Sequence, residues 1–177
     1  MSGAALTWVA QAEAIPALRA RLGEILIDCV GDGASIGFLN SLDRRQADAY
    51  WERVERAAGA GRCLLIVGAR GDAGVDGTVQ LDLDTPPNQP HRATVSKLLV
   101  HTQARRRGLG EALMARAEAE ARSAGRWLLT LDTATGEAER LYERLGWRRA
   151  GAIPDYAMNP DGSLTQTTFY WKRLEMP

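Results

Sequence analysis

The spacing of apolar residues in the first third of the chain predicts a strand followed by two helices. Apolar residues alternate at Leu6, Trp8 and Ala10, which is the period of a strand with one buried face. From Ala14 to Val30 they recur at three- and four-residue steps, a pattern typical of an amphipathic helix. A second helix is expected after Asp43, because aspartate favours the position just before a helix.

The middle of the chain predicts a hairpin and then a long strand. The apolar run CLLIVGA (63–69) and the alternating run GTVQLDLDT (77–85) flank a turn-like segment, so they predict an antiparallel hairpin. A proline-rich loop follows, and RATVSKLLVH (92–101) then predicts a strand. Because this strand ends in the apolar residues Leu98 to Val100, we expect that end to be buried on both faces.

The last third alternates helices and strands. An alanine-rich helix that begins near Leu109 is followed by the strand RWLLTLDT (126–133), a short helix (136–146) and the strands WRRAGAI (147–153) and QTTFYWKRL (166–174). Because a strand, a helix and a strand follow one another, the strands on either side of the alanine-rich helix should be parallel neighbours joined by a right-handed crossover. The pattern therefore predicts one α/β domain built on a mixed sheet.

Composition and charge narrow the function classes. The 177 residues fit one domain, and 22 basic residues balance 22 acidic ones, which argues against a nucleic-acid partner. Cys29 and Cys63 lie outside any metal-ligand spacing, so we expect two reduced core cysteines, no metal site and a cytoplasmic protein. No signal peptide is recognisable, and no stretch approaches the roughly 20 apolar residues of a membrane span, so no membrane partner is expected.

The turn before the alanine-rich helix, Arg105 to Gly110 (RRRGLG), carries the strongest chemical signal. The first N–H groups of a helix lack internal partners, glycines let an anion approach them, and arginines add charge for phosphate oxygens. The turn follows the end of a strand, where open α/β sheets bind ligands. Walker A and dinucleotide-binding spacings are both absent, which disfavours those enzymes. A solvated basic turn is the alternative interpretation.

Two motifs resemble those of one superfamily. KLLVHTQARRRGLGEALM (97–114) resembles the acyl-CoA pyrophosphate signature of GNAT N-acetyltransferases, and AERLYERLGW (138–147) resembles their later motif. Together with GASIGFLNSLD, LDT and IPDYAMNPDGSLTQTTFYWKRL, they resemble the tabtoxin-resistance acetyltransferase type over nearly the whole chain. The resemblance implies a single acetyltransferase domain over 1–177. Its GNAT-like fold would have a mixed, mostly antiparallel sheet of about seven strands with one parallel pair, flanked by about four helices.

The resemblance also implies a reaction. The enzyme would use acetyl-CoA as cosubstrate, without a metal, and would acetylate the amine of a small amino-acid-like metabolite or toxin by direct transfer, as in antibiotic or toxin resistance. The strand end would pair with the pantetheine arm, and the turn would hold the pyrophosphate. The coenzyme residues are then Leu98, Leu99, Val100, Arg105, Arg106, Arg107, Gly108, Leu109 and Gly110.

Two residues are candidates for proton transfer. Tyr142 is the candidate general acid for the coenzyme thiolate, with simple packing as the alternative. Asp132, at a strand end, would accept the amine proton or fix the ammonium, unless it only caps the next helix. The candidate acceptor-binding residues are Asp32, Ser35, Asn40, Trp51, Thr94 and Tyr156. Trp51 has core packing as its alternative. Thr94 stands where the toxin-acetylating enzyme carries an acid, which leaves room for another base or another substrate.

Other functions stay open at this point. The chain could acetylate a protein N-terminus or a lysine, or it could bind acetyl-CoA without catalysis. The resemblance also implies a homodimer, for which the C-terminal strand TTFYWKRL (167–174) is a candidate contact, because an apolar edge strand needs a cover.

Overall fold

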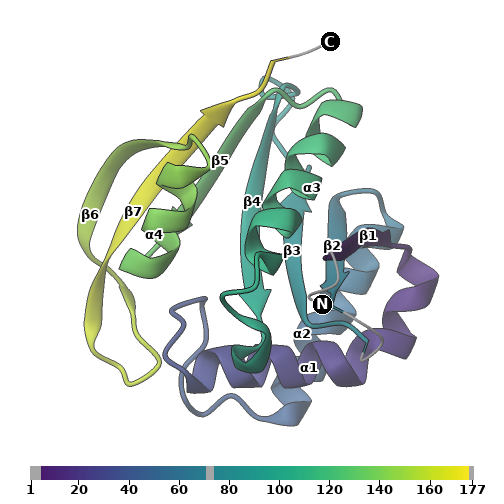
Figure 1. Cartoon of the computed structure of the whole chain (residues 1–177), viewed down its shortest axis with the longest axis vertical. Coiled ribbons are helices and arrows are strands. Elements are labelled where there is room, and N and C mark those ends of the chain that lie inside the picture. Colours follow the sequence, from purple (N-terminus) through teal and green to yellow (C-terminus); the bar gives the residue numbers. More distant parts are fainter. Residues whose placement is uncertain (1–4, 71–73, 176–177) are drawn as a thin grey trace.

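The computed structural model describes residues 5–70 and 74–175, which form a seven-stranded sheet with helices on both faces (Figure 1). The strands, in the order β1-β2-β3-β4-β5-β7-β6 across the sheet, are β1 (Leu6–Ala10), β2 (Cys63–Ala69), β3 (Gly77–Asp82), β4 (Arg92–Val100), β5 (Leu128–Thr133), β6 (Arg148–Met158) and β7 (Leu164–Arg173). The α-helices are α1 (Ile15–Gly31), α2 (Arg44–Gly59), α3 (Leu109–Ser123) and α4 (Gly136–Arg144), and two short 3-10 helices are η1 (Ala12–Ala14) and η2 (Thr102–Ala104).

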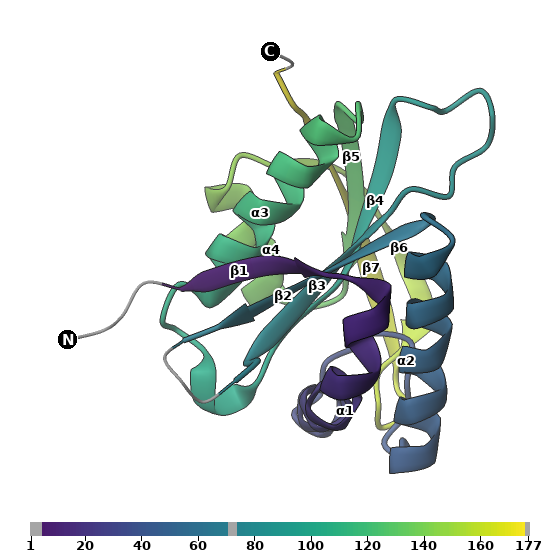
Figure 2. The same cartoon turned by 90° about the vertical axis from the view of Figure 1, so that its right-hand side faces the viewer.

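The helices divide the core into two layers. Seen edge-on, α3 and α4 lie on one side of the sheet, and α1 and α2 lie on the other (Figure 2). Leu113 and Ala117 of α3 are fully buried against the first side, and Leu22 and Trp51 are fully buried on the second. Each large apolar side chain buried in this way contributes about 1.5–3 kcal/mol to stability. The sequence-based prediction of an α/β domain on a mixed sheet with one parallel pair is confirmed.

Local signals set the helix starts. Asp43 caps α2 with a capping box, in which its side chain accepts from the Gln46 backbone N–H at 2.7 Å and the Gln46 side chain accepts from the Asp43 N–H at 2.9 Å. Gly108 precedes α3 with a φ of 79°, a left-handed conformation that glycine adopts without strain. Both helices therefore begin where the sequence indicated.

The C-terminal strand is not an edge strand, which corrects the sequence-based expectation. Strand β7 pairs with β5 on one side and with β6 on the other. Strand β6 is the outer strand, and it exposes Ile153, Tyr156 and Met158. The expectation was wrong because the chain turns back after β6 and inserts β7 between the two strands that precede it. Consecutive order in the sequence gives no sign of this insertion.

Strands β4 and β5 pair over only part of their length. Their parallel register runs from Arg92 beside Leu128 to Thr94 beside Thr130, and it goes no further. Beyond this point β4 has a bulge, because Lys97 and Leu98 together face one residue of β3. Bulges bend and twist a strand. The sheet therefore splits at the C-terminal half of β4.

The split corrects the expected burial of the end of β4. Leu99 is buried, but Leu98 and Val100 are only half-buried. Since β5 has separated from β4 at this level, one side of the strand end has no neighbouring strand and faces the pocket described below.

Candidate active site

The turn between β4 and α3 forms an anion-binding arrangement of backbone groups. Arg106 has a φ of 59° and Gly108 a φ of 79°, and left-handed residues in such a turn make successive N–H groups converge on one point. The turn ends at the first residues of α3, where N–H groups lack partners within the helix. A β-carbon placed on Gly108 would meet no atom within 4 Å, so the space beside it is open. These features together suit a phosphate group.

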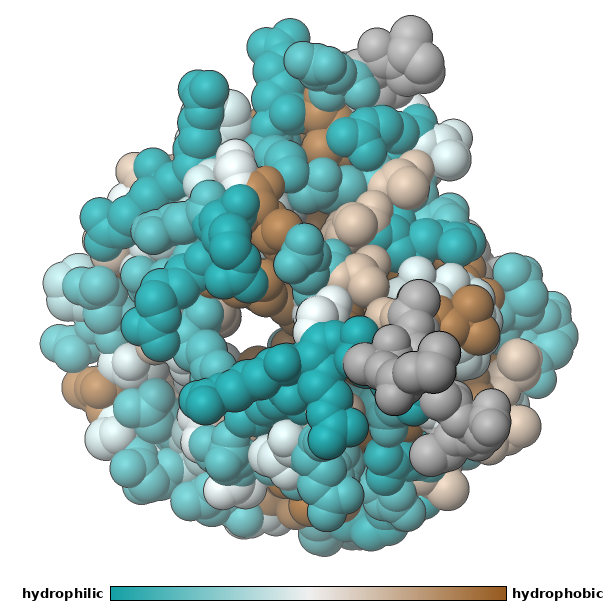
Figure 3. Space-filling view, in the orientation of Figure 1, coloured by the Kyte–Doolittle hydropathy of each residue, from teal (hydrophilic) through white to brown (hydrophobic). Residues whose placement is uncertain are grey.

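A pocket of about 510 Å³ lies beside this turn. It is bounded by the end of α1, the end of β4, the turn and α4, and eight of the nine expected coenzyme residues line it. The exception is Arg107, which is exposed and does not line the pocket. Figure 3 shows an opening through the middle of the molecule, at the place where Figure 1 shows β4 separating from α4 and β7. The split in the sheet is therefore an open passage.

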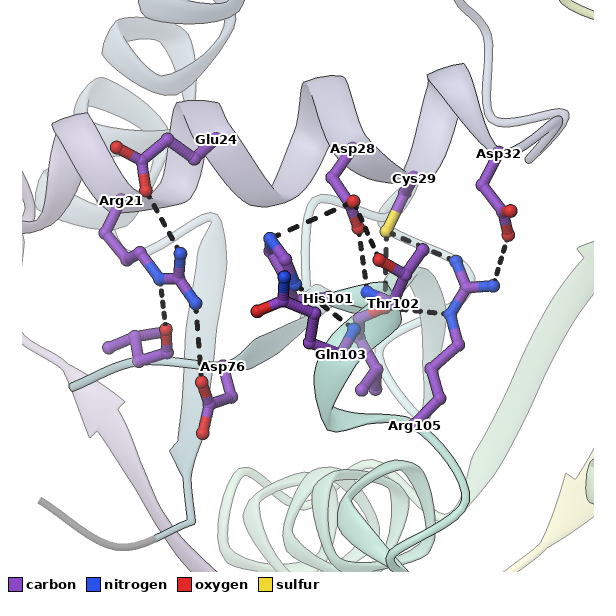
Figure 4. Close-up of polar contacts among 12 residues, drawn as sticks. Arg21, Glu24, Asp28, Cys29, Asp32, Asp76, His101, Thr102, Gln103 and Arg105 are labelled. Carbon is purple, nitrogen blue, oxygen red and sulfur yellow. Dashed lines mark hydrogen bonds and ion pairs between the residues drawn. The ribbon is translucent and has the colours of Figure 1, made fainter. Parts of the chain in front are cut away.

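Arg105 is held by neighbours inside the pocket (Figure 4). Its guanidinium forms an ion pair with Asp32, donates to the Val100 carbonyl at 3.1 Å and lies 3.9 Å from the Cys29 sulfur. Asp32 was expected to contact the acceptor, but the structure places it in the lining of the pocket beside the turn and pairs it with Arg105. The end of α1 is thus fastened to the strand that leads into the turn.

A second fastening joins α1 to η2. The Asp28 carboxylate accepts from the backbone N–H of Thr102 at 2.8 Å and from its hydroxyl at 2.9 Å, and His101 Nε2 lies 3.8 Å from the same carboxylate (Figure 4). Sequence reasoning missed this contact, because 74 positions separate the two partners. The turn is therefore held in place by α1 as well as by its own backbone conformation.

Tyr142 and Asp132 do not line this pocket. Tyr142 is buried, and its ring lies 6.1 Å from the rings of both Trp147 and Tyr170. Burial raises the pKa of Tyr142, and the negative charge of Asp132 raises that pKa further, so the phenol is protonated at neutral pH. The side chain of Asp132, on β5, is exposed, and its charge acts on the tyrosine.

Three of the expected acceptor residues lie where two loops meet. The Ser35 hydroxyl donates to the Met158 carbonyl at 3.1 Å, and the Asn40 N–H donates to the Pro160 carbonyl at 2.8 Å. These bonds join the loop between α1 and α2 to the hairpin formed by β6 and β7. Tyr156 belongs to the same hairpin, and its exposed ring packs edge-on against Phe169 at 5.3 Å.

The other two expected acceptor residues have different surroundings. Trp51 has no exposed surface and lies in the core, so the structure does not bring it to the site. Thr94 shares a hydrogen bond of 3.3 Å with Thr130, and its hydroxyl accepts from Arg92 at 2.9 Å. A cation, rather than an acid, therefore stands beside the position at which the resemblance led us to expect a carboxylate.

Sequence reasoning missed Lys97, which lies at the bulge of β4. Its half-buried ammonium is within the electrostatic reach of Asp132, and it lies 3.9 Å from the point that a β-carbon on Gly37 would occupy. One signal could have found it. The chain has only two lysines, Lys97 and Lys172, among its 22 basic residues, and Lys97 interrupts an apolar strand.

Other site classes find no support in the part of the chain that the structure describes. Within residues 5–70 and 74–175, no group of three or more His, Cys, Asp or Glu side chains is arranged to hold a metal ion. Over the same residues, no helix has the length and apolar character needed to cross a membrane.

Comparison with known proteins gives the family. The model of the acetyltransferase (GNAT) domain matches residues 56–149. Among solved structures, yncA from Salmonella typhimurium, determined with its cofactor acetyl-CoA, superposes with a TM-score of 0.77 at 20% identity, covering 99% of this chain and 96% of that one. A ribosomal-protein-alanine N-acetyltransferase from Brucella melitensis matches with a TM-score of 0.74 at 23% identity, covering 96% and 99%.

A third structure, provisionally named a phosphinothricin N-acetyltransferase, has a TM-score of 0.77 at 17% identity and covers 97% and 99% of the two chains. The names of these proteins point to different acceptors, and at such low identity the likeness establishes the fold alone. The family model, in contrast, spans more than half of the sequence and includes β4 and β5, the strands on either side of the split. The chain belongs to the GNAT acetyltransferase family.

Proposed function

We propose that this acetyltransferase moves an acetyl group from acetyl-CoA directly to the amine of a small amino-acid-like compound, as enzymes of the tabtoxin-resistance type do. One observation carries the proposal. The pocket between the end of β4 and α4 connects a turn suited to an anion with the edge of a strand that has no neighbouring strand. An elongated molecule with phosphates at one end and an amide-containing arm suits that arrangement.

The coenzyme residues divide by role. The N–H groups of the turn at Arg106 to Gly110 hold the pyrophosphate, and the exposed arginines add positive charge. The edge of Leu98 to Val100 that no strand covers hydrogen-bonds the pantetheine arm as a further strand would, apart from the Val100 carbonyl, which Arg105 already occupies. An N–H of this segment holds the acetyl oxygen. Arg105 serves chiefly as a structural tie, because Asp32 and the Val100 carbonyl occupy its guanidinium.

Tyr142 and Asp132 handle the protons. As the amine nitrogen bonds to the thioester carbonyl carbon and the carbon–sulfur bond breaks, Tyr142 donates its proton to the leaving thiolate. The raised pKa of the phenol keeps that proton available at neutral pH. Asp132 accepts the proton that the amine loses, directly or through water. No acyl group is carried by the enzyme in this scheme.

The loop contacts favour a small acceptor over a protein chain. Hydrogen bonds from Ser35 to Met158 and from Asn40 to Pro160 join the loop between α1 and α2 to the β6–β7 hairpin. We call the face of the sheet beside these two segments the acceptor side. A bridge of this kind narrows the approach to the split, whereas a protein substrate needs an open groove. Acetylation of a protein N-terminus or lysine is therefore the second choice.

Association and location are also proposals. Two free cysteines, both buried, support a reducing cytoplasm. A homodimer would use β6, the outer strand with exposed apolar side chains, rather than β7.

Calorimetric titration with acetyl-CoA and with free CoA tests the proposal. We expect micromolar binding that is lost in Gly108→Asp, because a carboxylate would then stand in the open space beside the turn and repel phosphates. Asp43→Ala, which removes the N-cap of α2 and lies outside the pocket lining, is the control for a general loss of stability. A screen of small amines for thiol release then identifies the acceptor. Equal binding of acetyl-CoA by the wild type and Gly108→Asp would contradict the assignment of the turn.

A further inference from the structure

Lys97 occupies a backbone conformation that costs free energy. Its φ of 51° is left-handed, a conformation that is strained for any residue with a β-carbon. Strain of this kind persists where the surrounding structure imposes it, and it is concentrated at ligand sites. The bulge of β4 imposes it here, since Lys97 and Leu98 share one partner position on β3.

The bulge redirects the Lys97 side chain. Simple alternation along β4 would put residue 97 on the same face as Ala93 and Val95, which are buried in the core beneath α3. Instead, the ammonium lies beside Gly37, in the loop between α1 and α2 on the opposite face. That loop is the one that Ser35 and Asn40 join to the β6–β7 hairpin. The strained backbone thus delivers a cation to the acceptor side of the sheet.

The ammonium of Lys97 has no bonded partner within the described residues. The other lysine, Lys172, is also half-buried, but it donates at 2.7 Å both to the Glu118 carboxylate and to the Leu145 carbonyl. Lys97 has no comparable hydrogen bond or ion pair in residues 5–70 and 74–175. Burial lowers its pKa, while the charge of Asp132 acts to raise it. A cation that has lost water and has no hydrogen-bonded anion can accept one from a ligand.

The charges on this face match a zwitterion. Asp132 supplies a negative group and Lys97 a positive one, and the two interact electrostatically. Arg92 adds a second cation on the same strand, held by the hydroxyls of Thr94 and Thr130 rather than by a carboxylate. An acceptor with an ammonium and a carboxylate on neighbouring atoms could place its amine at Asp132 and its carboxylate at Lys97.

We propose that Lys97 binds the carboxylate of the acceptor while Asp132 faces its amine. The acceptor is then an amino acid or a compound with the same pair of charges, and the amine without the carboxylate is a poor acceptor. This inference rests on the proposed function and narrows its substrate class. Lys97 is a specificity-determining residue in this scheme, and the reaction itself still uses Tyr142 and Asp132.

The test compares an amino-acid acceptor found in the amine screen with its amide, in which a neutral carboxamide replaces the carboxylate. We expect the wild type to favour the acid, and we expect the ratio of kcat/KM for acid over amide to fall about 10- to 100-fold in Lys97→Met, mainly through KM for the acid. Lys97→Arg, which keeps the charge, should retain most of the preference. Arg45→Met removes an exposed cation of α2 and should leave the ratio unchanged.

A second variant separates binding from folding. Lys97→Gly relieves the left-handed strain, so its melting temperature should equal or exceed that of Lys97→Met, and its acid preference should be lost to the same extent. An unchanged acid-to-amide ratio in Lys97→Met overturns the inference. The inference is also overturned if Lys97→Met lowers kcat equally for both acceptors and changes the dependence of kcat on pH. Lys97 would then act as a base. Binding of acetyl-CoA without acetylation of any small amine would instead overturn the proposed function itself.

Discussion

The contact between Asp28 and Thr102 should stabilise the fold and the coenzyme turn together. Asp28→Ala removes the acceptor of two hydrogen bonds, of 2.8 and 2.9 Å, and leaves the Thr102 N–H without its partner. A hydrogen bond to a charged group contributes about 1.5–3 kcal/mol, and the low end applies because the Asp28 side chain is 24% exposed. We expect a loss of about 2–3 kcal/mol in the free energy of unfolding, or about 5–10 °C in Tm.

Urea denaturation followed by tryptophan fluorescence measures this loss. Thr102→Val removes only the hydroxyl bond to the carboxylate and should cost about 1.5 kcal/mol. The double variant Asp28→Ala/Thr102→Val should be little less stable than Asp28→Ala alone, because the carboxylate partner is already gone. Strictly additive losses, or a loss below about 0.5 kcal/mol in Asp28→Ala, would refute the reasoning. Calorimetry should also show weaker acetyl-CoA binding in Asp28→Ala, since the turn is then held less firmly.

Two further outcomes follow from the ionisable side chains. Tyr142→Phe should lower kcat about 10²-fold while the Kd for acetyl-CoA stays within about twofold, as measured by thiol release and calorimetry, and an unchanged kcat would remove Tyr142 from the mechanism. Burial, aided by the charge of Asp82, raises the pKa of Cys63 to about 12 from an ordinary value of 9.0. Because the pKa of Cys63 is higher in the folded state than in the unfolded chain, its thiol favours folding fully below pH 9. This part of the free energy of unfolding is lost as the pH rises from 9 toward 12. Deprotonation of Cys63 in the unfolded chain should therefore lower the free energy of unfolding by about 2 kcal/mol between pH 8 and pH 10.5. Urea titrations at the two pH values measure this difference, and Cys63→Ala should not show it.

Local signals made most of the fold predictable. Apolar periodicity located the strands and helices, since a side chain's face depends only on its position along a regular element. Asp43 and Gly108 marked helix starts because capping and left-handed turns involve residues close together in sequence. The insertion of β7 between β5 and β6 was not predictable in this way, because strand order depends on pairing energies between distant segments.

The candidate site was likewise predictable only where its residues are close together in the sequence. The glycines and arginines of the turn predicted an anion site, which remains a prediction, and eight of the nine expected coenzyme residues line one pocket. The partner of Arg105 could not be read from the sequence, because Asp32 lies 73 positions away and reaches it only when α1 packs against β4. Lys97 escaped notice for a related reason. A bulge shifts a side chain to the other face of a strand, and regular alternation gives no warning of it.

From the sequence alone one could infer the class of domain, a turn suited to an anion and the resemblance to GNAT acetyltransferases, since each depends on residues that are neighbours along the chain. Three other features became visible in the folded structure: where the sheet opens, which arginine pairs with an aspartate, and that Lys97 lies beside the loop between α1 and α2. These features arise when β4 and β5 separate and α1 closes over the turn. They are set by contacts between residues tens of positions apart, and such contacts exist only once the chain has folded.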